Sequence, residues 1–245
     1  MHIVYYTTSK TRCRLFICLL IIFLCAAVLF FVCAHSGAAR PAAVQSLPLK
    51  GKVIVLDPGH GGYDPGVMKN GIEEKEIVLK IAFKLRDYLQ AAGARVVMTR
   101  ESDRDFLDVP AAGPKKQQDM TNRMQIVNAA GPDLFISLHV NAIGSPIWHG
   151  AQVFYKTDCT ASKEYAEKIQ QELRRVLGNT ERQIKPGNYY VLNHADSAAV
   201  LVECGFLSHP REAQELCEPA YQSKVAWAVY GGILRSFLPE EAAVE

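Results

Sequence analysis

Cysteine is scarce over most of this sequence, which leaves little support for disulfides or cysteine-rich metal sites. Seven cysteines occur among 245 residues, and four of them lie within the first forty. The remaining three are an odd number without CxxC spacing: Cys159, Cys204 and Cys217. This pattern indicates neither a disulfide scaffold nor a cysteine-rich zinc site, and small apolar thiols in or near a core explain it more simply.

An excess of basic charge is also absent once the first forty residues are set aside. The whole chain has 27 Lys and Arg against 25 Asp and Glu, a formal net charge of +2. Lys10, Arg12, Arg14 and Arg40 account for four of these cations, so 23 remain against 25 acids, a net charge of −2. Because no basic patch or RNA-binding motif stands out, nucleic acid is disfavoured as a partner.

The first forty residues lack acids altogether and contain a long apolar run. Leu15–Ala34 carries no charge and follows three basic residues. Twenty residues at ~1.5 Å per residue span roughly 30 Å, the thickness of a bilayer core. Small residues after the run also fit a signal-peptide cleavage site, so residues 1–40 are predicted as either an anchor or a cleaved signal. In both cases the rest is exported, to the outer face of the cytoplasmic membrane or the cell wall.

Residues 41–50 contain small residues and proline without periodicity, and they are predicted as a linker. From Gly51 onward, short β-branched runs alternate with amphipathic stretches. The predicted strands are Lys52–Asp57, Arg95–Thr99, Asp133–His139 and Ala199–Glu203, with two weaker candidates at Ala151–Tyr155 and Tyr189–Leu192. The predicted helices are Glu74–Ala91, Asp119–Ala130, Ser162–Val176 and Pro219–Phe237. This order predicts a single α/β domain over residues 51–240, with a twisted, mostly parallel sheet flanked by helices on both faces.

Polar side chains mark the ends of three predicted strands. His60 lies in a glycine-rich turn after the first strand, His139 closes the third, and Glu203 closes the fourth. Ligands of such sheets gather at the carboxyl ends of the strands. A carboxylate at the tip of an apolar strand is partly desolvated, which raises its pKa toward the range of a general base. Taken singly, however, each histidine is better explained as a structural or surface residue.

Four ordered stretches carry a resemblance to a known family. They are VIVLDPGHGGYDPG, NGIEEKEIVLKIAFKLRDYL, DLFISLHVNA and AVLVECGFLSHP, which span most of residues 51–237. With them the chain resembles the zinc-dependent N-acetylmuramoyl-L-alanine amidases. The resemblance implies hydrolysis of the amide bond between the lactyl group of N-acetylmuramic acid and L-alanine in peptidoglycan. The alternatives are a zinc peptidase acting on cell-wall peptides and a catalytically silent peptidoglycan-binding protein.

The resemblance also implies a role for individual residues. It implies that one zinc ion is coordinated by His60, Glu74 and His139. Glu203 matches the catalytic glutamate. Glu74 occupies the acid position of the Gly-x-x-Glu-Lys motif, and Glu73 and Glu76 are its register alternatives. Two histidines and one carboxylate leave an open fourth position, as a catalytic rather than a structural zinc requires.

A closer similarity is to the sporulation- and germination-specific branch of this family. It rests on Asn141-Ala142-Ile143, Ser145-Pro146 and Trp148, and on the membrane-spanning start. The similarity to that branch implies that the enzyme acts on the spore cortex, either in muramic-δ-lactam formation or in germination. It also implies a location in the forespore intermembrane space. An activating protein partner is a further expectation.

Supporting roles are expected for four more residues. Asn141 and Arg182 are predicted to bind substrate, although a solvated surface pair of Arg182 and Lys185 explains that stretch equally well. Asp57 is expected to contact and orient a zinc ligand without binding the zinc itself. His194 precedes the Glu203 strand closely enough to be a candidate for a similar contact.

Overall fold

The structure is a computed structural model that describes residues 4–35, 47–110 and 113–238. Its contacts divide the chain into two compact units, Met1–Ser46 and Leu47–Glu245. Most of the predicted linker at residues 41–50 lies outside the described residues. Each unit is considered by itself.

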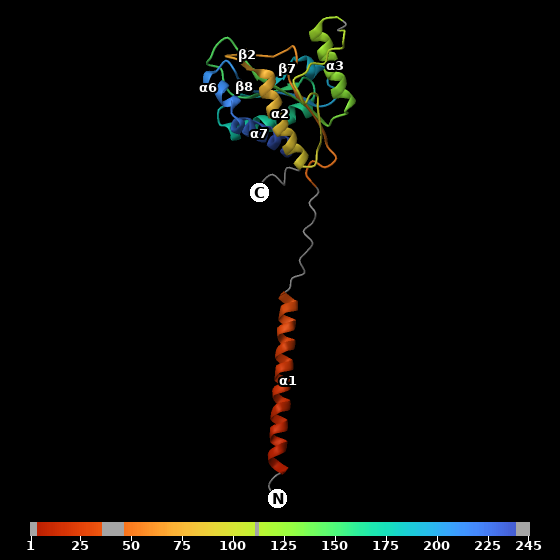
Figure 1. Cartoon of the computed structure of the whole chain (residues 1–245), viewed down its shortest axis with the longest axis vertical. Helices are drawn as coiled ribbons and strands as arrows, with labels where there is room; N and C mark the ends of the chain where they lie inside the picture. Colours follow the sequence, from red (N-terminus) through yellow and green to blue (C-terminus); the bar gives the residue numbers. More distant parts are fainter. Residues whose placement is uncertain (1–3, 36–46, 111–112, 239–245) are drawn as a thin grey trace. The chain divides into compact units, whose positions relative to one another are not determined.

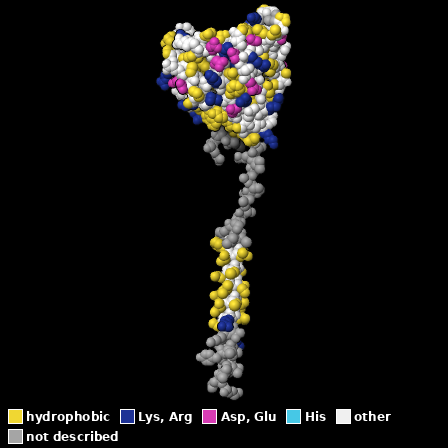
Figure 2. Space-filling model, viewed as in Figure 1, with side chains coloured by type: hydrophobic (Ala, Val, Ile, Leu, Met, Phe, Trp, Pro, Cys, Tyr) yellow, Lys and Arg dark blue, Asp and Glu magenta, His cyan; other side chains and the backbone are white. Residues whose placement is uncertain are grey.

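The first unit consists of one helix, α1 (Val4–His35). Its segment Arg12–Phe31 is long and apolar enough to cross a membrane, and its described side chains are exposed. Figure 2 shows hydrophobic side chains along this segment. By length and composition a signal sequence has the same character, so the helix fits both interpretations of the N-terminal segment.

The second unit is built on a six-stranded sheet in the order β4-β1-β5-β8-β6-β7. Its strands are β1 (Val53–Pro58), β4 (Arg95–Met98), β5 (Leu134–Asn141), β6 (Gln152–Lys156), β7 (Lys185–Gly187) and β8 (Ala199–Phe206). The first four strands in this order pair in parallel, β6 is antiparallel to β8, and β7 is parallel to β6. The prediction of a mostly parallel sheet is therefore confirmed.

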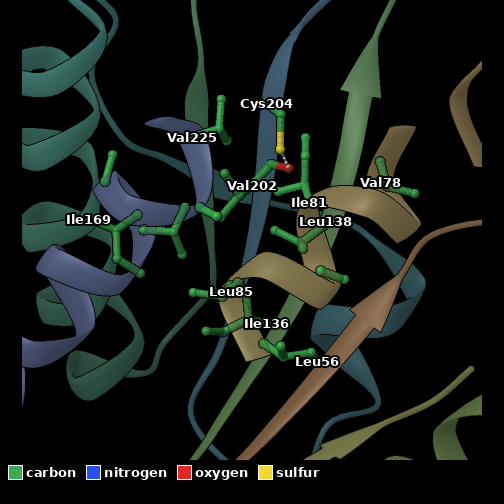
Figure 3. Packing of buried hydrophobic residues seen from close by; sticks show 14 of the residues in the cluster. Leu56, Val78, Ile81, Leu85, Ile136, Leu138, Ile169, Val202, Cys204 and Val225 are labelled. Carbon is green, nitrogen blue, oxygen red and sulfur yellow. Dashed lines mark hydrogen bonds between the residues drawn. The ribbon is translucent and has the colours of Figure 1, made fainter. Parts of the chain in front are cut away.

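Helices cover both faces of the sheet, as expected (Figure 1). The larger core lies beneath α2 (Glu74–Ala91), α4 (Thr160–Leu177) and α7 (Pro219–Phe237). Figure 3 shows how side chains of β1, β5 and β8 meet those of these helices in this core. A smaller core lies beneath α3 (Lys115–Ala129) and α5 (Tyr190–Asn193). Successive strand residues alternate between the two cores, because side chains of a strand point to opposite faces.

The predicted helices α2 and α7 have the observed bounds, and α3 and α4 begin earlier than predicted. The predicted strand at Tyr189–Leu192 is wrong, since this segment forms the single helical turn α5. Its apolar residues, Val191 and Leu192, are buried in the smaller core. A short apolar run of this kind does not distinguish a strand from a helical turn. Elements without a prediction are β2 (Met68–Lys69), β3 (Ile72–Glu73), β7 and α6 (Pro210–Cys217).

The described part of the second unit starts at the amino-terminal edge of the sheet. The Leu49 amide donates to the carbonyl of Ala92, which follows α2, and the Arg95 amide donates to the carbonyl of Lys52. Both β1 and β4 begin at this edge. The polar residues that mark the strand ends therefore lie at the opposite edge.

Candidate active site

His60 lies two residues beyond β1 in a left-handed backbone conformation, with φ +61°. Its ring makes two contacts with carboxylates. Nδ1 lies 2.9 Å from Oδ2 of Asp64, and Nε2 lies 3.2 Å from Oε1 of Glu74. If Nδ1 carries the ring proton it donates to Asp64, and Nε2 is then left with a lone pair directed toward Glu74.

Glu74 is the first residue of α2, and it is buried, with 2% of its surface exposed. Its two oxygens accept backbone hydrogen bonds from separate segments: Oε2 from Val67, just before β2, and Oε1 from Val140 in β5, both at 2.9 Å. Oε1 also lies 3.0 Å from Nδ1 of His139. Burial raises the pKa of Glu74, but hydrogen bonds and charge interactions with His139 and His60 outweigh it and hold the pKa well below its usual range. The carboxylate is therefore ionised, as a metal ligand must be.

One ligand atom from each of His60, Glu74 and His139 lies within 4.8 Å of the other two. Two glycines make this approach possible. A Cβ atom on Gly59 would lie 2.3 Å from Cε1 of His139, and one on Gly66 would lie 2.6 Å from Oε2 of Glu74. Two imidazole nitrogens and one carboxylate oxygen form the donor set of a catalytic zinc site with an open position. The residues thus fit a zinc ion, and among the described residues they form the one such group of side chains.

Glu203 lies beside this cluster because its strand β8 pairs in parallel with β5. The register places Glu203 opposite His139. Its side chain is 7% exposed, and Oε2 has no hydrogen-bond partner. Burial raises the pKa of Glu203 to about 7, the nearby Glu74 adds to this rise, and His139 and His60 oppose it. A buried carboxyl group whose pKa is near neutrality can both accept and return a proton.

Two cavities meet at the cluster, and both are lined by His60, His139 and Glu203. One of about 130 Å³ extends toward α3 and α5, where Met120 and Val191 line it. The other, of about 380 Å³, extends past Asn141 and Ala142. A third cavity, of about 260 Å³, shares Val67 and Ala142 with the second. The cluster thus lies within a run of cavities that can hold the groups on both sides of a scissile bond.

Comparison with known proteins identifies the family. Residues 54–235 match the N-acetylmuramoyl-L-alanine amidase family. The chain is a member of this family. The resemblance found in the sequence is thereby confirmed, and the enzymatic class is that of an amidase acting on peptidoglycan.

Several individual amidases are similar along most of the chain. The germination-specific N-acetylmuramoyl-L-alanine amidase of Bacillus subtilis (strain 168) is 46% identical over 195 residues, which cover 78% of this chain and 82% of that protein. The N-acetylmuramoyl-L-alanine amidase LytC of the same organism is 34% identical over 207 residues, 83% of this chain but 39% of LytC. The CwlD amidase of Clostridioides difficile, solved in complex with the GerS lipoprotein, superimposes with a TM-score of 0.73 at 38% identity, covering 76% of this chain and 98% of that chain.

The structure separates the two residues expected to bind the amidase's substrate. Asn141 lines the 380 Å³ cavity beside the cluster. Arg182 lies farther along the sheet: its Nε donates to the carbonyl of His149 at 2.8 Å and its Nη1 to Oε1 of Gln152 at 3.3 Å. Its guanidinium carbon lies 5.6 Å from the centre of the exposed Trp148 ring. Of the two, only Asn141 lines a cavity that contains the cluster.

Glu73 and Glu76, the register alternatives to Glu74 in the amidase motif, do not join the cluster. Glu73 pairs with Lys75 at 3.4 Å. Neither Glu73 nor Glu76 belongs to the group of side chains that could hold a metal ion among the described residues. The geometry therefore favours Glu74, the residue that the motif indicated.

Two expected contacts to the ligands are not formed. The Asp57 carboxylate accepts hydrogen bonds from Thr99, Ser137 and Arg123, and none joins it to His60 or His139. Burial raises the pKa of Asp57, but the Arg123 charge and the hydrogen bonds outweigh it and lower the pKa to about 2. The second residue, His194, stacks on Tyr190, with 3.8 Å between ring centroids.

Asp64, rather than Asp57, contacts one of the proposed zinc ligands, His60. Its Oδ2 lies against Nδ1 of His60 and also accepts a hydrogen bond from Nζ of Lys116, and its Oδ1 accepts the Gly66 amide at 3.1 Å. Burial raises the pKa of Asp64, but hydrogen bonds from Lys116 and His60 lower it to about 2 overall. A carboxylate behind a metal-binding histidine fixes the tautomer and the ring orientation. The sequence held no signal for this contact, because a four-residue separation brings side chains together on a helix and residues 60–64 form a turn.

Proposed function

We propose that this amidase binds zinc through His60, Glu74 and His139. We further propose that it cleaves the bond between the lactyl carbonyl of N-acetylmuramic acid and the amino nitrogen of L-alanine. The observation that carries the proposal is the position of Glu203, whose unpartnered carboxylate lies opposite a ligand histidine. A zinc ion bound there would polarise the amide carbonyl and lower the pKa of water. The residues of the chain supply the orientation and the proton transfer.

Glu203 acts as the general base and then as the general acid in this proposal. Its carboxylate takes a proton from the attacking water while the new oxygen–carbon bond forms at the lactyl carbonyl. It returns that proton to the alanine nitrogen as the carbon–nitrogen bond breaks, so that a free carboxylic acid and a free amine result. The desolvated position of Glu203 supports both transfers, because its pKa of about 7 matches this dual task.

Substrate groups on the two sides of the scissile amide would occupy the cavities that meet at the cluster. Asn141 would donate to or accept from the substrate on the side of the larger cavity. Arg182, next to the exposed Trp148, would pair with a carboxylate of the stem peptide that extends beyond the cavities. Both side chains are half-buried: Asn141 is the last residue of β5, and Arg182 bonds to Gln152, which pairs with Glu203 of β8.

The biological setting follows from the relatives and from the first unit. The 46% identical relative is named as germination-specific, which supports a role in spore cortex maturation, through muramic-δ-lactam formation, or in germination. Helix α1 supports export, with residues 1–40 acting as an anchor or a cleaved signal, 41–50 as a linker and 51–240 as the catalytic domain. The proposed location is the outer face of the cytoplasmic membrane, the cell wall or the forespore intermembrane space. The complex of CwlD with GerS supports a protein partner for this chain as well.

The decisive experiment is product analysis with the full chain purified in detergent. Zinc-loaded protein is incubated with intact peptidoglycan, and the released fragments are tested for new amino termini. Peptides that begin with L-alanine, together with about one bound zinc per chain, support the proposal. Shortened stem peptides would identify a peptidase instead. Binding to peptidoglycan without any cleavage would identify a silent binding protein.

A further inference from the structure

Two buried arginines converge on the turn that carries His60. Arg100 follows β4 and Arg123 lies in α3, and their exposed fractions are 1% and 2%. Neither side chain was singled out by the sequence. A guanidinium removed from water needs hydrogen-bond acceptors around it, and half of the hydrogen bonds that these two groups donate go to the carbonyls of Pro58, Gly59 and His60.

The carbonyls of three consecutive turn residues accept these hydrogen bonds. Arg100 donates from Nε to Pro58 and from Nη2 to Gly59, both at 2.9 Å. Arg123 donates from Nη2 to His60 at 3.0 Å and from Nη1 to Pro58 at 3.3 Å. The two guanidinium groups thus bind the backbone on which the His60 ring is mounted.

The backbone held in this way is a strained one. His60 has a positive φ of +61°, a conformation that residues with a side chain rarely adopt and that persists only where the surroundings impose it. The next residue, Gly61, lies close to the Arg100 side chain: a Cβ added to Gly61 would lie 3.0 Å from Cδ of Arg100. The φ of His60 determines where its ring points, and the ring points at Asp64 and Glu74.

We infer that Arg100 and Arg123 are positioning residues of the metal site, which fix the His60 turn in its ligating conformation before the metal binds. This inference rests on the proposed metal role of His60. Neither arginine lies in the group of metal-binding side chains. Their loss therefore weakens metal binding through the orientation of one ligand.

Arg100 offers the cleaner test of the two. Arg123 also pairs with Asp57 at 2.7 Å and with Asp119 at 3.3 Å, so its removal leaves buried carboxylates unpaired. Arg100 donates to carbonyls only, including those of Ser102 and Lys75. The variant Arg100→Met keeps much of the apolar stem and removes the donors.

The experiment compares the full-length wild type, Arg100→Met and a control in detergent. The zinc dissociation constant is measured by competition with a chromophoric chelator, and the visible spectrum is recorded with Co²⁺ as a probe of coordination. For Arg100→Met we expect zinc affinity to fall roughly 10- to 100-fold, the usual effect of removing support behind a metal ligand. The cobalt spectrum changes, and activity is restored by excess zinc with an unchanged KM.

The control is Leu173→Ala, which creates a cavity beneath α4 in the larger core. It lowers the melting temperature of the apo protein but leaves the zinc dissociation constant and the cobalt spectrum unchanged. If Arg100→Met binds zinc as tightly as the wild type, the inference is wrong. If Arg100→Met does not fold, Arg100→Lys is measured in the same way, and wild-type affinity there also overturns it.

A His60→Ala variant separates this inference from the proposed function. If it binds zinc as the wild type does, the proposed ligand set itself is wrong. If it loses zinc while the folded arginine variant keeps wild-type affinity, only the positioning role fails. Loss of zinc affinity in both variants supports both the proposed ligand set and the positioning role of Arg100.

Discussion

Glu203 and His139 lie directly opposite each other on the parallel strands β8 and β5. The register of one pair of strands therefore determines the separation of the proposed base from a proposed metal ligand. A shift of either strand by one residue would turn one of these side chains to the other face of the sheet. The reacting groups are thus positioned by the most buried part of the domain.

The first prediction concerns Glu203→Gln. This change keeps the size of the side chain but removes the ability to carry a proton, so hydrolysis of peptidoglycan should fall by about 10²- to 10⁴-fold. Zinc content should stay at the wild-type level, because Glu203 is not among the proposed ligands. Release of L-alanine-terminated peptides and metal analysis of the same preparation test this. A variant that cleaves at the wild-type rate would remove Glu203 from the mechanism.

The second prediction concerns Asp64→Asn. Without the Asp64 carboxylate, the tautomer of His60 that leaves Nε2 free is no longer favoured. Zinc affinity should therefore fall roughly 10- to 100-fold. Competition with a chelator measures the effect. Asp108→Asn is a suitable control, since this exposed carboxylate bonds only to Gln118 and Asn122 among the described residues. Equal affinities in the two variants would contradict the prediction.

The third prediction concerns Gly59→Ala. The added Cβ would lie 2.3 Å from the ring of His139, so the ring must move away from its partners. We expect zinc binding to weaken roughly 10- to 100-fold, as when a ligand is misplaced. Gly144→Ala is the matched control, because a Cβ at Gly144 meets nothing within 4 Å. Zinc titration of both variants checks the prediction, which fails if they bind alike.

The fourth prediction concerns the stability of the domain. Asp57→Asn leaves the buried Arg123 without its 2.7 Å partner, while the 3.3 Å contact with Asp119 remains. Breaking a buried ion pair on one side costs about 3–5 kcal/mol, and we expect the lower end of that range. Urea denaturation of the full chain in detergent, followed by tryptophan fluorescence, measures the free energy of unfolding. An unchanged free energy would show that the pair contributes nothing.

The fifth prediction concerns the pH dependence of the same contribution. The pKa of Asp57 is lowered from 3.8 to about 2 in the folded domain. A lowered folded-state pKa gives a stabilisation that is complete above about pH 4 and is lost as the pH falls toward 2. The difference in unfolding free energy between wild type and Asp57→Asn should therefore shrink over this interval. A difference that stays constant down to pH 2 would contradict the prediction.

The fold could be predicted from the sequence where the signals were long or repeated. The periodic apolar residues of α2 and α7 predicted their observed bounds, and the apolar runs predicted β1, β4, β5 and β8. Tyr189–Leu192 could not be assigned correctly, because four residues are too few to show a period. Its conformation depends on packing against α3 and the sheet.

The proposed site could be predicted in its side chains but not in its supports. The motif indicated His60, Glu74, His139 and Glu203, and the structure brings them together. The contact of Asp64 with His60 depends on a positive φ that a sequence does not reveal. Arginines that bind backbone carbonyls leave no pattern in the sequence, since their partners can be any residue.

The domain begins at the amino-terminal edge of the sheet, and its cavities open at the carboxyl edge. Substitutions at the amino-terminal edge, where the Leu49 amide donates to the Ala92 carbonyl, can therefore alter the stability of the domain while His60 and Glu203 keep their places at the other edge.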